Sequence, residues 1–196
     1  MKRLVVLRHG ETEWSASGRH TGRKDIPLTF EGERKARLLG QRLVHFGIEP
    51  VRVLSSPRQR ALKTALLAGL DQHRIEATEL LAELDYGEYE GRTTEEIRSE
   101  TPSWNLFKDG CPGGETLEAA GDRADELLAE VAPEDGAGDV ALVGHGHFSR
   151  ILAARYLGLD ASSASGFALD TASLSILGHE HEWRAVLLWN HGAGIR

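Results

Sequence analysis

Residues 4–10 read Leu-Val-Val-Leu-Arg-His-Gly, and the interpretation of the whole chain starts from this stretch. A short apolar run that ends in polar residues and a glycine is typical of a buried strand leading into a turn. Open α/β sheets place their ligand sites at the carboxyl ends of such strands. A guanidinium group can bind phosphate through two hydrogen bonds, and an imidazole can act as a nucleophile. Arg8 and His9 therefore indicate anion chemistry at the end of this strand.

Two later apolar runs have the same form. Val-Arg-Val-Leu at 51–54 leads through Ser-Ser-Pro to Arg58, and Val-Ala-Leu-Val at 140–143 leads through Gly144 to His145. Any one of these polar residues alone is typical of a surface loop. Because the carboxyl ends of parallel strands meet at one edge of a sheet, we expect Arg8, His9, Arg58 and His145 to converge there.

Helical patterns separate these strands. We expect a helix from an N-cap at Thr29 to about Phe46, stopped by Gly47, two others over about 58–67 and 115–131, and one that follows His147 and ends at about Tyr156. A short strand is expected over 76–80. Two or three strands are expected in the tail, including 173–177 and 184–188, with a turn near 178–182. This order predicts one domain over 1–196, a three-layer α/β/α sandwich around a mostly parallel, doubly wound sheet. A partly helical cap is expected at about 92–112.

Composition excludes several classes of protein. The chain has 196 residues and a net charge of −7, which argues against a nucleic-acid partner. No apolar run approaches the roughly 18 residues of a membrane span. Cys111 is the only cysteine, which rules out an intrachain disulfide and favours a cytoplasmic location. A thiol nucleophile at Cys111 is less favoured than an inert loop or buried cysteine. Trp183 and Trp189 fit core packing and a homodimer face equally well.

The stretch Leu7-Arg8-His9-Gly10-Glu11-Thr12-Glu13-Trp14 resembles the signature of the histidine phosphatase superfamily, which includes cofactor-dependent phosphoglycerate mutases and broad-specificity phosphatases. The resemblance continues in family order over nearly the whole chain, through segments at 21–32, 55–64, 81–91, 113–116 and 143–146. It implies a phosphoglycerate mutase-like fold. Jointly these motifs are highly specific.

The resemblance also implies roles for individual residues. His9 would be the nucleophile that becomes phosphohistidine, with its other ring nitrogen bonded to a carbonyl or similar acceptor. Arg8 and Arg58 would hold the phosphoryl oxygens, and His145 would add a donor and, if protonated, positive charge. Glu83 would protonate the leaving alkoxide and later deprotonate water. The remaining motif positions that would face the ligand are Thr21, Gly22, Tyr86 and Gly146, while Ser15 replaces a phosphate-binding asparagine of the family.

The short cap favours hydrolysis over mutase activity. Mutases of the family carry a longer insertion with paired arginines, whereas residues 92–112 contain no Arg-Arg pair. We therefore expect a phosphatase of small phosphorylated metabolites, including sugar phosphates or bisphosphates, with phosphoglycerate mutase as the alternative. Trp14-Ser15 and the motifs at 86–91, 103–111 and 144–147 resemble a narrower branch of acid phosphatases and sedoheptulose-1,7-bisphosphatases. In that branch the specificity candidates would be His20, Trp104, Asn105 and His147.

Two further hypotheses come from other classes of protein. A metalloprotein would use as ligands two closely spaced histidine pairs, His145 with His147 and His179 with His181, together with His191. No cysteine cluster supports it, and His179 and His181 fall in an expected turn, so we expect no metal and no cofactor. A catalytically inactive protein that only binds phosphorylated ligands is disfavoured, because every expected catalytic residue is present.

Overall fold

The computed structural model describes residues 3–131 and 138–192. Its centre is a six-stranded sheet in the order β3-β2-β4-β1-β5-β6. The strands are β1 (Leu4–Arg8), β2 (Arg52–Ser55), β3 (Ile75–Ala77), β4 (Val140–Gly144), β5 (Leu174–Glu180) and β6 (Trp183–His191). The first four are mutually parallel, while β5 pairs antiparallel with both β1 and β6. The sheet is therefore mostly parallel with an antiparallel edge.

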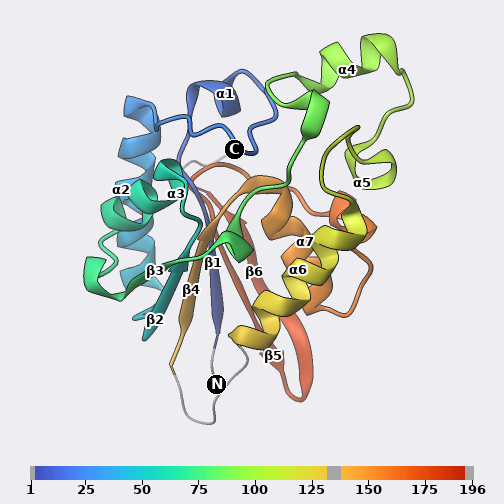
Figure 1. Cartoon of the computed structure of the whole chain (residues 1–196). Coiled ribbons are helices and arrows are strands. Elements are labelled where there is room, and N and C mark those ends of the chain that lie inside the picture. Colours follow the sequence, from blue (N-terminus) through green and yellow to red (C-terminus); the bar gives the residue numbers. More distant parts are fainter. Residues whose placement is uncertain (1–2, 132–137, 193–196) are drawn as a thin grey trace.

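Helices cover both faces of the sheet, which confirms the predicted three-layer α/β sandwich (Figure 1). One face carries α2 (Phe30–His45) and α3 (Gln59–Leu67), and the other carries α6 (Leu117–Glu130) and α7 (Gly146–Tyr156). The alternation of side chains along β1 explains why its whole apolar run is buried. Val5 and Leu7 join the cluster under α2 and α3, whereas Leu4 and Val6 join the cluster under α6 and α7.

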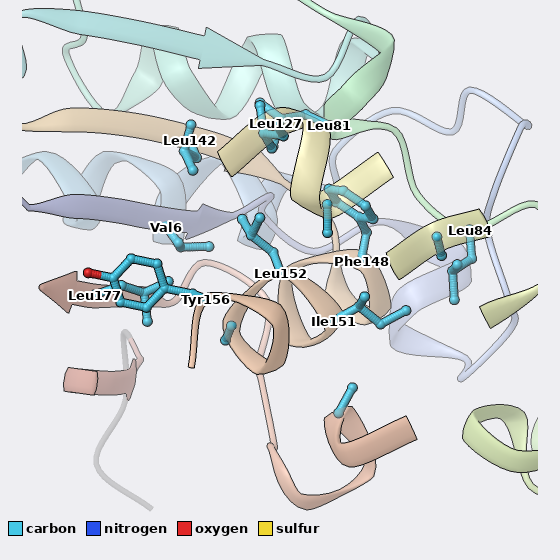
Figure 2. Close-up of a cluster of buried hydrophobic side chains, with 14 of the residues drawn as sticks. Val6, Leu81, Leu84, Leu127, Leu142, Phe148, Ile151, Leu152, Tyr156 and Leu177 are labelled. Carbon is cyan, nitrogen blue, oxygen red and sulfur yellow. The ribbon is translucent and has the colours of Figure 1, made fainter. Parts of the chain in front are cut away.

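The larger cluster fixes α7, the helix that begins at the functional end of the sheet. Phe148, Ile151 and Leu152 of α7 are fully buried and lie with Val6 and Leu142 of the sheet in one close-packed group (Figure 2). Fully burying each such side chain stabilises the fold by roughly 1.5–3 kcal/mol. The start of α7 is therefore a rigid platform.

The predicted helices are confirmed to within one or two residues at their ends. The Thr29 hydroxyl accepts a hydrogen bond from the Gly32 N–H at the start of α2, and Gly47 follows its end at a φ of 58°. Thr116 caps α6 in the same way, so that helix begins at Leu117. The tail holds two strands with a two-residue connection at 181–182, which is tighter than the predicted turn.

The predicted strand over 76–80 is wrong beyond Ala77. Thr78 caps a short 3₁₀ turn, Glu79–Leu81, because its hydroxyl accepts from the Leu80 N–H. That turn ends the strand and leads the chain towards Glu83. A short helix that was not among the predicted elements, α1 (Glu13–Ala16), follows β1.

The cap lies over the carboxyl ends of the parallel strands. It contains α4 (Thr94–Glu100) and α5 (Leu106–Asp109), which stand at the same end of the molecule as α1 (Figure 1). Trp104 joins its parts, because its Nε1–H donates to Gly110 O at 2.8 Å and its carbonyl accepts from Arg98 Nε at 2.9 Å. Within the described residues, no helix has both the length and the apolar character needed to cross a membrane.

Candidate active site

His9 lies directly after β1 with one ring nitrogen already engaged. Its Nδ1 is 2.6 Å from Gly10 O, and its backbone N–H donates to Gly144 O at 2.9 Å. A carbonyl oxygen can only accept, so Nδ1 carries the proton and Nε2 keeps its lone pair. Burial, followed by the charges of Arg60 and Arg8, holds the pKa of His9 well below its usual value. The ring is therefore neutral, with Nε2 available as a nucleophile.

Arg8 lies half-buried beside His9 with hydrogen-bonding capacity to spare. Its Nη1 donates to Leu169 O, while its Nε is buried and has no partner within the described part of the chain. The guanidinium packs against Gly146, where a Cβ would lie 3.0 Å from Arg8 Cζ. Gly146 thus lets the guanidinium approach the start of α7. A buried N–H without a partner is costly unless a ligand accepts it.

Arg60 is the main functional residue that the sequence analysis missed. Its side chain is fully buried in the first turn of α3, and its Nε lies 3.2 Å from Nδ1 of His145. Its Nη groups donate to the carbonyls of three loop residues, Thr21, Gly22 and Lys24. Arg60 therefore ties the loop to the end of the sheet. Arg60 could have been found from its position in the motif segment 55–61, in which Arg58 was chosen as the phosphate-binding arginine.

His145 is a neutral donor whose tautomer Arg60 fixes. Because Arg60 Nε can only donate, His145 Nδ1 must accept, and the ring proton lies on Nε2. Nε2 is 2.8 Å from Ser56 Oγ, so Ser56 accepts that hydrogen bond. Burial and then the charge of Arg60 hold the pKa of His145 well below its usual value. The positive charge considered for His145 is therefore not present at neutral pH.

Arg58 stands at the edge of the site. It is the N-cap residue of α3, and its Nη2 lies 3.6 Å from the Glu79 carboxylate in a groove beside the main cavity. Its Nε is nevertheless buried without a partner within the described residues. Arg60 and Arg8, rather than Arg58, are the arginines whose charges lower the pKa of His9. The positive charge nearest the nucleophile is therefore supplied by Arg8 and Arg60.

Glu83 is held at the N-terminus of α7. Its Oε1 accepts from the backbone N–H groups of Leu84 and Phe148 at 3.0 and 2.8 Å, and its Oε2 accepts from that of His147 at 3.0 Å. These three backbone N–H groups fix the position of the carboxyl group at the start of α7. Oε2 accepts one of these hydrogen bonds where Oε1 accepts two, so Oε2 has more capacity for a substrate oxygen or a water.

A cavity of about 240 Å³ brings most of the predicted residues together. Those that line it are Arg8, His9, Ser15, His20, Thr21, Glu83, Tyr86, Gly146 and His147. The cavity is also lined by residues that the sequence analysis did not single out, among them Arg19, Thr94, Arg150 and Leu169. No motif position marked these residues. They come from the loop after α1, the cap, α7 and the segment before β5.

A neutral polar wall forms one side of the cavity. Tyr86 Oη and His147 Nδ1 are 2.6 Å apart, and the His20 ring lies 4.8 Å from the Tyr86 ring, centroid to centroid. Burial lowers the pKa of His20 to about 4 and that of His147 well below its usual value, and it raises the pKa of Tyr86. All three side chains are therefore uncharged at neutral pH.

Four residues that were predicted to contact the ligand have their polar groups engaged within the protein or lie outside the cavity lining. The Ser15 hydroxyl donates to Thr12 O and accepts from Thr12 N, which closes a capping box on α1. Gly22 does not line the cavity, and its N–H donates to the Glu90 carboxylate. Trp104 also lies outside the cavity lining and is only 4% exposed. Asn105, in turn, caps α5 through Phe107 N–H.

The thiol and metal hypotheses receive no support from the geometry. Burial and the charge of Asp85 raise the pKa of Cys111 to about 12, so its thiol stays protonated. Across residues 3–131 and 138–192, no group of three or more His, Cys, Asp or Glu side chains is arranged to hold a metal ion.

Residues 4–192 match the family model of the histidine phosphatase superfamily (branch 1). The chain belongs to this superfamily. Its relatives include the acid phosphatase of Mycobacterium tuberculosis, with 47% identity over 179 residues, 91% of this chain and 87% of the relative. The sedoheptulose 1,7-bisphosphatase of Saccharomyces cerevisiae is 34% identical over 185 residues, 80% of this chain and 68% of the relative. A solved structure of a Mycobacterium tuberculosis open reading frame has a TM-score of 0.93 and 44% identity, covering 98% of this chain and 99% of that one. The resemblance and the assignment as a phosphatase enzyme are confirmed.

Proposed function

We propose that this phosphatase hydrolyses phosphomonoesters of small metabolites through a phosphohistidine intermediate on His9. The observation that carries the proposal is the 2.6 Å contact between His9 Nδ1 and Gly10 O, which leaves Nε2 as the free nucleophile in a cavity shared with Glu83. The unpartnered, buried Nε–H groups of Arg8 and Arg58 support it, because a phosphoryl group would satisfy them.

In the first step, His9 Nε2 attacks phosphorus and forms a P–N bond while the P–O bond to the leaving alcohol breaks. The leaving oxygen takes a proton from Glu83, so this step starts from the protonated carboxyl group. Charge develops on the non-bridging oxygens of the phosphoryl group. Arg8 and Arg60 stabilise that charge without moving, since packing and hydrogen bonds already fix both guanidinium groups.

In the second step, water replaces the departed alcohol. Glu83, now ionised, takes a proton from that water, whose oxygen attacks phosphorus as the P–N bond breaks. The products are inorganic phosphate, neutral His9 and protonated Glu83, which is ready for the next cycle. The three backbone N–H groups around Glu83 support its ionised form during this step.

We assign His145 and Ser56 to positioning. The Arg60–His145–Ser56 chain of hydrogen bonds directs the Nε2 proton of His145 to Ser56 Oγ. The Ser56 hydroxyl proton is then free to donate to a phosphoryl oxygen. Reaction without a metal ion is part of the proposal, since arginines supply the positive charge, and a cytoplasmic location agrees with the single cysteine.

The test compares the wild-type protein with His9→Ala and with the control His73→Ala, because His73 is an exposed histidine in the 3₁₀ turn Gln72–Arg74, before β3. Wild type and His73→Ala should release phosphate from p-nitrophenyl phosphate and form an acid-labile, alkali-stable phosphoprotein. His9→Ala should do neither, yet it should still bind vanadate or inorganic phosphate. Turnover that survives in His9→Ala would refute the covalent mechanism. Interconversion of 2- and 3-phosphoglycerate without phosphate release would establish the mutase alternative.

A further inference from the structure

Arg150 is a cation of the cavity wall that the proposed phosphoryl transfer does not use. It lies on α7, four residues after Gly146, against which the Arg8 guanidinium packs. Residues four apart lie on the same face of a helix, about 6 Å apart along its axis. Arg150 therefore lies one helical turn beyond the site of phosphoryl transfer.

Neighbouring elements hold the Arg150 guanidinium in place. Its Cζ is 4.4 Å from the centroid of the Phe107 ring of α5, and its Nε and Nη2 donate to the carbonyls of Ala164 and Ser165 at 3.1 and 3.4 Å. These contacts leave Nη1 without a hydrogen-bond partner within the described part of the protein. The group is therefore ordered before any ligand arrives, with one donor arm uncommitted.

Among the described residues, no carboxylate lies within ion-pair distance of Arg150, and the charge of Glu83 acts on it only from farther away across the cavity. Arg8 shares this property, whereas two other arginines nearby are paired with carboxylates. Arg19, at the mouth of the same cavity, lies 3.4 Å from Glu96, and Arg155, on the same helix, lies 2.5 Å from Asp125. Arg150 is partly desolvated, and an arginine remains ionised in proteins. A desolvated cation without a carboxylate partner is costly, and a bound anion would offset that cost.

The wall between the two cationic ends of the cavity is neutral. Tyr86, His20 and His147 offer hydrogen-bonding groups without charge. We infer that Arg150 forms a second anion subsite, and that the substrate is a phosphomonoester with a second anionic group, either phosphate or carboxylate. This inference rests on the proposed function and narrows it. A polar, uncharged linker between the two anions fits the neutral wall.

Pairs of substrates that differ in the second anion test the inference. Fructose 1,6-bisphosphate is compared with fructose 6-phosphate, and 3-phosphoglycerate with glycerol 3-phosphate. The first pair tests whether the second anionic group is a phosphate, and the second pair tests whether it is a carboxylate. Wild type should favour at least one doubly anionic member by kcat/KM. Arg150→Met keeps the apolar stem, and we expect it to reduce that preference by about 10–100-fold, the range for a lost charge-assisted contact. Arg150→Lys should restore part of it, and Arg155→Met is the matched control with the wild-type preference.

A binding measurement keeps this test independent of turnover. In the His9→Ala background, the dissociation constant of fructose 1,6-bisphosphate or 3-phosphoglycerate should rise at least tenfold when Arg150→Met is added, whereas that of inorganic phosphate should change far less. An equal loss for both members of each substrate pair, or equal weakening of all ligands, would overturn the second subsite while leaving the hydrolase proposal intact. Absence of any phosphohistidine in wild type would instead refute the proposed function, and the binding result would still decide the subsite.

Discussion

Substitution of Gly146 by alanine should lower the catalytic rate without lowering the stability of the fold. A Cβ at this position would lie 3.0 Å from Arg8 Cζ, 3.2 Å from its Nε and 3.3 Å from its Nη2. Comfortable carbon contacts are about 3.5–4.0 Å, so the guanidinium must retreat by roughly 0.5–1 Å. Because a misplacement of about 1 Å can cost on the order of 100-fold in rate, we expect kcat/KM to fall by about 10–100-fold.

The same substitution should leave the fold intact. Gly146 is the first residue of α7, and alanine is preferred to glycine in helices by up to about 1 kcal/mol. The free energy of unfolding should therefore stay within about 1 kcal/mol of wild type, while the affinity for inorganic phosphate falls with kcat/KM. Both are measured on one preparation, by urea unfolding and by competitive inhibition of p-nitrophenyl phosphate hydrolysis.

Gly121→Ala is the matched control. Gly121 lies inside α6, and a Cβ there would meet Ala161 Cβ at 3.5 Å, an ordinary contact. We expect a gain of about 0.5–1 kcal/mol in stability with wild-type kinetics. Wild-type kcat/KM in Gly146→Ala would refute the argument that the position of Arg8 against α7 sets the rate.

Arg60→Met should lower the free energy of unfolding by at least about 3 kcal/mol and abolish most activity, because it strands His145 Nδ1 and the carbonyls of the 21–24 loop. Arg58→Met should cost under about 1 kcal/mol, since Glu79 is a surface partner, and equal urea midpoints for the two variants would contradict this. Stability should also fall as pH drops below 6.5, because the lowered folded pKa values of His9, His20, His145 and His147 mean that the unfolded chain binds their protons first. Each histidine adds up to about 1.4 kcal/mol per pH unit to the slope of the free energy of unfolding against pH. When urea unfolding is measured at several pH values, His20→Gln should lower this slope by up to that amount above about pH 4. An unchanged slope would contradict the argument that burial lowers the pKa of His20. Activity should survive dialysis against EDTA, and loss that added metal restores would refute reaction without a metal ion.

The sheet was predictable because apolar runs are strong local signals. The runs at 4–7 and 140–143 are buried on both faces of the sheet, and so are Val53 and Leu54 of the run at 51–54, so their composition alone identifies them. The strand at 75–77 is partly exposed and only three residues long, and the capping hydroxyl of Thr78 decides where it ends. Such a local competition between a strand and a 3₁₀ turn leaves little trace in hydrophobic periodicity.

The site was only partly predictable because strand ends are visible in sequence and helix faces are not. The expectation that Arg8, His9 and His145 meet depends on parallel strands that end at one edge of the sheet. The alternation of strands and helices along the chain predicts such an arrangement. Arg60 and Arg150 lie on helices, and each serves the site only because its helix is oriented towards it. Whether an arginine on a helix faces solvent or a cavity depends on tertiary packing, so neither residue stood out from its neighbours.

Arg8 and the Leu169 carbonyl that it contacts are 161 positions apart, and within the described residues the two neighbours of β1 are strands that begin at Val140 and Leu174.

 During synthesis, β1 must therefore wait for β4 or β5 before it acquires either neighbour. Contacts this distant in sequence slow folding, because a long loop must close before they form. Arg8 and Leu169 can meet only after the segment that joins them has been synthesised. A nascent chain that ends before Leu169 thus cannot fix the Arg8 guanidinium, and the order of synthesis itself delays completion of the cavity.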